Sequence, residues 1–192
     1  MSEPMKKYLE TERTYLREFT ESSSDIDALY DLNSDPDVMK YLANGKTSTR
    51  EEIIEVNNRV LAYYAKYKGR FGVWALHLKS NDEFMGFFIL RPQKEDPDNL
   101  KFIELGYRLR KKFWRLGIAT EVSKPLIDRC FKEYDVETVY ADANIENEGS
   151  IGVMKKCGLK FEKNYNHPMV HWIPGDNTAR YILNKNEYFN SK

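Results

Sequence analysis

The sequence predicts an α+β fold with a mostly antiparallel sheet and one parallel crossover. After one short N-terminal strand, the apolar residues recur at helical spacing up to about residue 69 and then alternate over three successive strands. The rest of the chain returns to a helix–strand–helix–strand order. Three strands in a row favour antiparallel pairing, and a strand–helix–strand unit favours a parallel crossover, so we expect one sheet flanked by helices.

The N-terminal part is expected to be mainly helical. Residues 14–20 alternate as a strand does, and serines at 22–24 can cap the helix that follows. Asp35-Pro36 favours a helix restart. Capping boxes are available at Ser48 with Glu51 and at Thr49 with Glu52, and either would begin a helix that Gly69 ends.

The strands come next, and the first two are predicted to form a hairpin across residues 80–82. Gly106 is costly inside a plain strand, so we expect a bulge or a close backbone approach there. The expected elements are strands at 71–79, 83–91 and 101–110, a helix at 117–133, a strand at 138–144, a helix at 147–157, and β-like segments at 159–162, 170–173 and 181–183.

Length and composition favour a single domain over residues 1–192. The chain is 41% hydrophobic, and its 30 basic residues balance its 30 acidic ones, so nothing favours a nucleic-acid partner. Apolar runs are too short to predict a membrane span or a leader. Two cysteines give no disulfide framework, which fits a cytoplasmic protein, and the three histidines lack metal-ligand spacing.

The segment at 102–120 carries the clearest chemical signal. A strand leads into a basic turn and then into a helix that begins around Gly117. Unpaired N–H groups at a helix N-terminus attract phosphate, and glycine permits close approach to the backbone. The Walker A and dinucleotide-binding glycine patterns are both missing. A pyrophosphate site and a turn that merely caps itself with water therefore both remain open.

Four sequence blocks together resemble the GNAT superfamily of N-acetyltransferases, in its RimJ/RimL-like ribosomal-protein branch. They are TERTYLREFT, NSDPDVMKYL, ELGYRLRKKFWRLGIATEVSKPLID and NIENEGSIGVMKKCGLKFE, and with the predicted hairpin they cover most of residues 11–162. The resemblance implies a bulged strand and a strand–turn–helix pyrophosphate site in a GNAT-like sheet. It also implies that acetyl-CoA is the co-substrate.

The resemblance implies specific contacts with acetyl-CoA. The pantetheine arm would pair with the strand end around Leu109. The pyrophosphate would receive the backbone N–H groups of Arg115, Leu116, Gly117, Ile118, Ala119 and Thr120. Arg115 stands where the family usually has glycine. It could crowd the loop or add a guanidinium to the phosphates, and we favour the second.

The resemblance also implies roles for three polar residues. Asn147 matches a family asparagine that contacts the cofactor arm. Helix capping is the alternative explanation, and with the resemblance we favour the cofactor contact. Glu104 is the best candidate for the base that deprotonates the amine. The family's usual tyrosine acid is replaced by Met154, and Ser150 could substitute only by its position.

The predicted reaction is direct attack of an amine on the acetyl thioester. A protein N-terminal α-amine is the first candidate acceptor, and a small-molecule amine or polyamine is the alternative. A non-catalytic acyl-CoA-binding module is a further alternative, because Met154 and Arg115 depart from the family pattern. A homodimer is compatible with the sequence. Aromatic candidates for the acceptor pocket are Tyr30, Tyr41, Trp74 and Tyr107.

Overall fold

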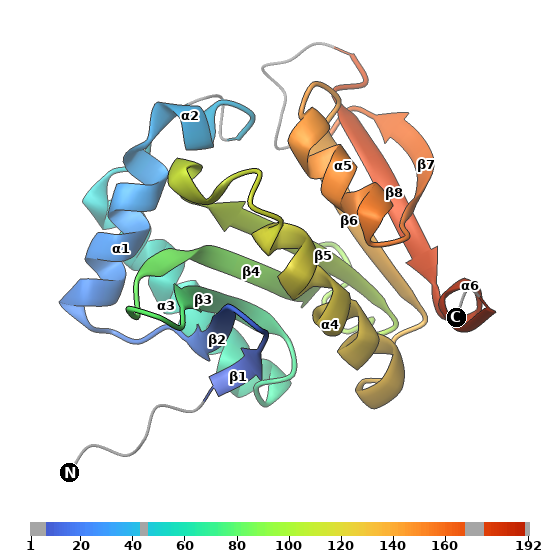
Figure 1. Cartoon of the computed structure of the whole chain (residues 1–192), viewed down its shortest axis with the longest axis horizontal. Helices are drawn as coiled ribbons and strands as arrows, with labels where there is room; N and C mark the ends of the chain where they lie inside the picture. Colours follow the sequence, from blue (N-terminus) through green and yellow to red (C-terminus); the bar gives the residue numbers. More distant parts are fainter. Residues whose placement is uncertain (1–6, 43–45, 168–174, 191–192) are drawn as a thin grey trace.

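The computed structural model describes residues 7–42, 46–167 and 175–190, whose strands form one eight-stranded sheet (Figure 1). The strands are β1 (Lys7–Glu10), β2 (Thr14–Glu18), β3 (Gly72–Leu78), β4 (Phe84–Pro92), β5 (Phe102–Leu109), β6 (Thr138–Asn144), β7 (Lys160–Tyr165) and β8 (Thr178–Asn184). Their order across the sheet is β1-β2-β3-β4-β5-β6-β8-β7, antiparallel throughout except for the parallel pair β5 and β6. The predicted α+β class is confirmed.

Helices cover both faces of this sheet. They are α1 (Ser23–Ser34), α2 (Pro36–Met39), α3 (Arg50–Tyr67), α4 (Ile118–Glu133), α5 (Glu148–Lys156) and α6 (Lys185–Asn190), with a 3-10 helix η2 at Lys111–Phe113. Leu29 of α1 and Ile53 of α3 pack with Ala75 in one apolar cluster. Val122 and Leu126 of α4 pack in another cluster, on the opposite face. The sheet therefore lies between two apolar clusters, one on each face.

Local capping explains where the N-terminal helices begin. Ser22 caps α1 by accepting from the Asp25 N–H, and Asp35 caps α2. Of the two possible capping boxes at the start of α3, the one formed is Thr49 with Glu52. This helix ends at Tyr67, before the predicted Gly69, because the chain turns left-handed at the next two residues.

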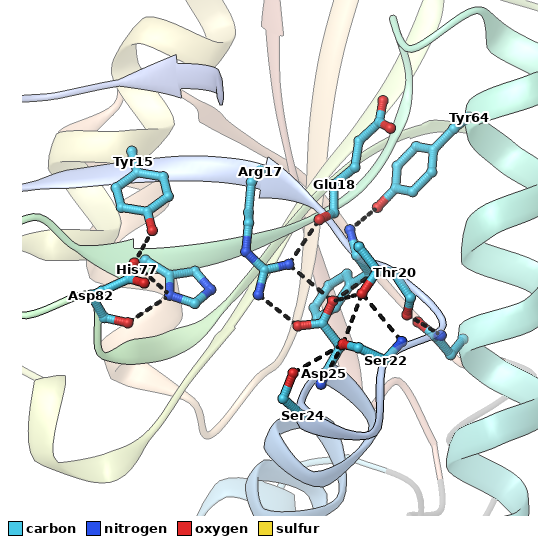
Figure 2. A network of polar contacts seen from close by, with 12 residues as sticks. Tyr15, Arg17, Glu18, Thr20, Ser22, Ser24, Asp25, Tyr64, His77 and Asp82 are labelled. Carbon is cyan, nitrogen blue, oxygen red and sulfur yellow. Dashed lines mark hydrogen bonds and ion pairs between the residues drawn. The ribbon is translucent and has the colours of Figure 1, made fainter. Parts of the chain in front are cut away.

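An ion pair at the β2–α1 corner fixes α1 against the sheet (Figure 2). Arg17 donates to both carboxylate oxygens of Asp25, at 2.9 and 2.6 Å, and both side chains are buried. The Thr20 N–H donates to the same carboxylate at 2.7 Å. The charge of this buried arginine is thus compensated within the fold.

The prediction of a bulge at Gly106 is wrong. The β4–β5 pairing is continuous from Gly86 opposite Leu109 to Pro92 opposite Ile103, so Gly106 lies in a regular ladder. The register instead shifts between β3 and β4, beside Gly86. A Cβ on Gly86 would lie 2.0 Å from the Arg108 carbonyl oxygen. The backbones of β4 and β5 therefore approach closely at Gly86, and it is this β4 position that requires glycine.

Two further differences concern the first and last parts of the chain. The edge strand β1 and the short helix α6 were not predicted. Strand β8 begins three residues before the expected 181–183. The expected strand at 170–173 lies outside the described residues. Within the described part of the chain, no helix combines the length and apolarity needed to span a membrane.

Candidate active site

The sheet splits between β5 and β6. The two strands pair only at Phe102–Glu104 with Thr138–Tyr140, and beyond these residues they diverge (Figure 1). A cleft occupies the opening. Its lining residues come from β4, β5, β6, α4, α5 and the adjoining loops: Leu42, Phe87, Ile89, Arg91, Glu104, Leu105, Gly106, Tyr107, Arg108, Ser123, Ala141, Asp142, Ser150, Val153, Met154, Cys157 and Leu159.

This cleft reaches both faces of the sheet. Because side chains alternate along a strand, Glu104, Gly106 and Arg108 lie on the face covered by α1, whereas Leu105 and Tyr107 lie on the face covered by α4. We call these the α1 side and the α4 side of the cleft. The α1 side also contains Phe87, Ile89, Arg91 and Asp142, and the α4 side also contains Ser123, Ser150, Met154 and Cys157. Two molecules entering from opposite faces could therefore meet within the split sheet.

The loop before α4 presents unpaired backbone donors. Gly117 caps α4 with φ of 77°, and Arg115 also has a positive φ of 61°. Within the described residues, the backbone N–H groups of 115–120 donate to no protein acceptor, and the first internal bond of α4 comes from Glu121 N–H to the Gly117 carbonyl. These donors and the helix dipole make the loop a candidate site for an anion such as a diphosphate.

Arg13, at the start of β2, braces this loop. Its Nη1 donates to the Leu116 carbonyl at 3.0 Å, and its Nε donates to the Glu121 carboxylate at 2.6 Å. Glu121 lies in the first turn of α4. The arginine offsets that carboxylate, so the anion site keeps the positive character of the helix N-terminus.

Strand β5 also turns backbone groups toward the opening. The Arg110 N–H donates to the Met85 carbonyl of β4 at 2.8 Å. Successive residues of a strand direct their backbone groups to opposite sides, so Tyr107 and Leu109 direct theirs away from β4. The Leu109 carbonyl accepts from the Trp114 indole at 2.8 Å. The other backbone groups of these two residues face the cleft, where an extended amide-containing chain could pair with them.

Glu104 lies on the α1 side in a bidentate ion pair. Arg91 of β4 donates to its two carboxylate oxygens at 2.7 and 3.2 Å, and each side chain is about one-fifth exposed (23% and 22%). The β4–β5 register places the two residues directly opposite one another. The pair holds the Glu104 carboxylate in one orientation beside the bare surface of Gly106.

Ser150 and Asn147 lie at the start of α5, on the other side of the cleft. Asn147 caps the helix by accepting from the Ser150 N–H at 3.1 Å, so its predicted capping role is confirmed. The hydroxyl of Ser150 lies 3.4 Å from that of Tyr107. Burial raises the pKa of Tyr107 to about 12, so its hydroxyl stays protonated near neutral pH. The sequence placed Tyr107 only among acceptor-pocket candidates.

Met154 and Cys157 complete the α5 wall. Met154 is buried and occupies the position where a tyrosine was expected from the resemblance. Burial raises the pKa of Cys157 to about 11, so this thiol is protonated and a poor nucleophile. Among the described residues, no three His, Cys, Asp or Glu side chains are grouped to hold a metal ion.

Several site features escaped the sequence analysis. The Arg91 partner of Glu104 was not predicted from the sequence. Nor was the second ion pair at the cleft, in which Arg180 donates to Asp142 at 2.9 and 2.8 Å. Trp74 is wrong as a pocket residue, because it is fully buried and stacks on Tyr8. One available signal was that residues 91 and 104 lie almost symmetrically about the 93–101 connection, six and seven positions from its middle residue, 97.

Known proteins share this architecture. The family model of the acetyltransferase (GNAT) domain matches residues 13–160. The chain is 29% identical over 163 residues to the FsC-acetyl coenzyme A-N(2)-transacetylase of Aspergillus fumigatus, covering 82% of this chain and 68% of the relative.

Two solved structures share the fold. A RimL ribosomal L7/L12 α-N-protein acetyltransferase in complex with coenzyme A has a TM-score of 0.76 and 16% identity, covering 95% of this chain and 99% of that one. A spermidine N-acetyltransferase from Vibrio cholerae in complex with CoA and spermine has a TM-score of 0.71 and 16% identity, covering 92% and 98%. Their acceptors differ, so they do not single out the RimJ/RimL-like branch.

The family match covers most of the chain and agrees with the split sheet and the open helix N-terminus. Acetyl-CoA is accordingly the co-substrate. The chain belongs to the GNAT family and is an acetyl-CoA-dependent acetyltransferase.

Proposed function

We propose that this enzyme acetylates the α-amino group of a peptide or protein by direct attack on acetyl-CoA. The observation that carries the proposal is the cleft through the sheet. It has an anion site and strand backbone on the α4 side and an oriented carboxylate on the α1 side. The two reactants would enter from opposite faces and meet at Gly106.

The α4 side offers backbone groups that would bind acetyl-CoA. The free N–H groups of residues 115–120 would bind the pyrophosphate, and the cleft-facing backbone of Tyr107 and Leu109 would pair with the pantetheine amides. Acetyl-CoA supplies an activated acetyl thioester. Asn147 would act chiefly by capping α5 and so holding Ser150 at the cleft.

Glu104 is proposed as the proton acceptor on the α1 side. As the amine nitrogen bonds to the acetyl carbon and the carbon–sulfur bond breaks, the nitrogen loses a proton that the carboxylate can take directly or through water. An α-amine needs only about one pH unit of deprotonation near neutrality, roughly 1.4 kcal/mol, whereas lysine needs roughly 4 to 5 kcal/mol. One carboxylate beside Gly106, already accepting hydrogen bonds from Arg91, is a limited means of removing a proton, which favours the α-amine.

The hydroxyl pair of Tyr107 and Ser150 is proposed to assist the leaving sulfur. Its position on the α4 side matches where the pantetheine arm would end, and the raised pKa keeps Tyr107 a donor. A thiol with an ordinary pKa of about 8.5 can also collect its proton from water. The missing tyrosine at Met154 is therefore compatible with turnover.

An acceptor panel tests the proposed function. CoA release is followed with a thiol reagent on short lysine-free peptides with a free N-terminus. The matched substrates are N-terminally blocked peptides with one internal lysine, and spermidine is a third acceptor. We expect kcat/KM to be at least tenfold higher on the free α-amine, with mass spectrometry locating the acetyl group there.

Two results would contradict the proposal. Acetylation mainly of the lysine side chain, or of spermidine alone, would assign the enzyme to another acceptor class. Tight acetyl-CoA binding with no turnover on any amine would favour the non-catalytic acyl-CoA-binding alternative.

A further inference from the structure

One arginine at the cleft differs from its counterparts in its charge environment. Six arginines of the described chain are not exposed: Arg17, Arg91, Arg108, Arg110, Arg129 and Arg180. Five of them have a carboxylate oxygen within 4.0 Å, at distances between 2.6 and 3.6 Å. Arg108 has no such partner among the described residues. The segments outside the described residues contain only one acidic side chain, Glu3.

The contacts of Arg108 are all uncharged. Its Nη1 donates to the Asn33 side-chain oxygen at the C-terminal end of α1, and its guanidinium lies over the Phe87 ring, 5.3 Å from the centroid. The acids around the end of α1 have other partners. Asp31 pairs with Arg110 and Asp37 with Lys111, whereas the Asp35 side chain caps α2. The asparagine therefore positions the guanidinium without neutralising it.

A partly buried cation without a counter-ion is costly to the fold. Removing charge from water costs several kcal/mol unless a partner compensates it. Consistent with this, burial lowers the pKa of Arg108 to about 10, which still leaves the side chain charged near neutral pH. Methionine or glutamine would fill the same space with a smaller desolvation penalty. The charge is therefore better explained by a ligand than by a role in folding.

The position of Arg108 indicates which ligand it would meet. It lines the α1 side of the cleft, two residues from Gly106 and on the same strand face as Glu104. The other charged lining residues of this side are already paired, Arg91 with Glu104 and Asp142 with Arg180. One positive charge thus remains uncompensated beside the place where the amine would react.

We propose that the acceptor carries an anionic group, a carboxylate or a phosphate, which Arg108 binds while the amine lies at Gly106 beside Glu104. This rests on the proposed function, and it narrows the acceptor to amines that are also acids. A guanidinium offers parallel N–H donors to either anion. A polyamine would instead bring a second cation against Arg108.

Matched acceptors test the proposal by turnover. L-alanylglycine is compared with L-alanylglycinamide, and L-alanyl-O-phospho-L-serinamide with L-alanyl-L-serinamide, in the wild type and in Arg108→Gln. We expect the wild type to favour at least one anionic member at least tenfold in kcat/KM, and the variant to reduce that preference to less than threefold. The pair that shows the preference distinguishes carboxylate from phosphate. Equal rates on both members of both pairs would overturn the proposal.

A binding measurement keeps the test independent of catalysis. With saturating CoA present to fill the site at α4, inorganic phosphate or succinate should raise the Tm of the wild type and leave that of Arg108→Gln unchanged. If no amine is acetylated but this shift appears, the proposed function fails while the anion site stands. No shift with either anion in the wild type would overturn the anion site.

Stability separates a ligand-binding arginine from a structural one. In anion-free buffer, Arg108→Gln should unfold at the same temperature as the wild type or higher, because it removes an unpaired buried charge. Arg17→Gln is the matched control and should unfold several degrees lower, because it leaves Asp25 buried without its partner. A comparable loss in Arg108→Gln would contradict the proposal.

Discussion

The two sides of the cleft are built from different parts of the chain. On the α4 side, the expected cofactor contacts come from backbone groups, namely the free N–H donors of residues 115–120 and the cleft-facing groups of β5. On the α1 side, every charged feature is a side chain whose partner lies on another element, as in Arg91 with Glu104 and Arg108 with Asn33. A backbone site tolerates sequence change at most positions, whereas a side-chain site changes its specificity with one substitution.

This difference implies that the two sides can be damaged separately. A change on the α1 side should affect turnover and acceptor choice but not acetyl-CoA binding. A change in the loop before α4 should affect acetyl-CoA binding first. The three substitutions below test that separation, beginning with the largest expected effect.

Glu104→Gln should produce the largest loss, of about a hundredfold in kcat near pH 7, with acetyl-CoA affinity almost unchanged. Glutamine retains the shape and one acceptor for Arg91 but cannot take up a proton. The defect should shrink as pH rises toward the pKa of the amine, because the free amine then forms without help. A rate–pH profile with calorimetric acetyl-CoA binding measures both effects.

A matched control separates proton transfer from loss of the ion pair. Arg91→Gln also breaks the pair but keeps the carboxylate, so its rate should fall less than that of Glu104→Gln. A Glu104→Gln defect that is the same at every pH would identify a structural role. An unchanged rate near neutral pH would remove Glu104 from the mechanism.

Gly117→Val should weaken acetyl-CoA binding at least tenfold, or about 1.4 kcal/mol. Gly117 has φ of 77°, a conformation that β-branched residues rarely adopt, so the loop must shift its N–H donors. A valine would also narrow the approach of the phosphates. Calorimetry on the folded variant measures the loss.

Gly152→Val is the matched control for this substitution. Gly152 lies within α5 with open space around its Cα and no left-handed backbone requirement, and valine is the better helix former. Its acetyl-CoA affinity should remain within about twofold of the wild type. Wild-type affinity in a folded Gly117→Val protein would contradict the pyrophosphate assignment.

The same contrast explains how much of the fold could be predicted from the sequence. Helix starts at Ser22 and Asn147 were predictable because a cap and its N–H partner lie within three residues. The bulge was misplaced because the steric conflict lies between Gly86 and the Arg108 carbonyl, on different strands. A glycine inside a strand indicates an unusual backbone conformation or a close contact, but the sequence does not show which neighbouring strand makes that contact.

The site was predictable to a similar extent. The loop at Gly117 combines a glycine, basic residues and a helix start in one short segment, so a candidate anion site could be predicted there from the sequence. Asp142 and Arg180 are 38 positions apart and meet only through the β6–β8 register. In the sequence, Arg108 resembles any other basic strand residue, and only the structure shows that none of the described carboxylates pairs with it.

The smallest expected effect concerns Arg115, for which the sequence left two roles open. This residue is exposed and left-handed, with φ of 61°, and no protein partner is found for its side chain among the described residues. Left-handed backbone costs a non-glycine residue about 1 kcal/mol or more, which explains why glycine is usual here. We expect this strained residue to contribute by keeping its guanidinium free to contact the phosphates of acetyl-CoA.

Arg115→Gly should therefore change stability and affinity in opposite directions. Relief of the strain should raise the free energy of unfolding by about 0.5 kcal/mol, since part of the gain is offset by the flexibility of glycine in the unfolded chain. Loss of an exposed phosphate contact should weaken acetyl-CoA binding roughly two- to fivefold at low salt and less at high salt. Arg115→Lys keeps the charge and the strain, so it should differ little from the wild type in both. If Arg115→Gly binds acetyl-CoA more tightly than the wild type at low salt, the arginine obstructs the loop instead, and the anion site rests on backbone donors alone.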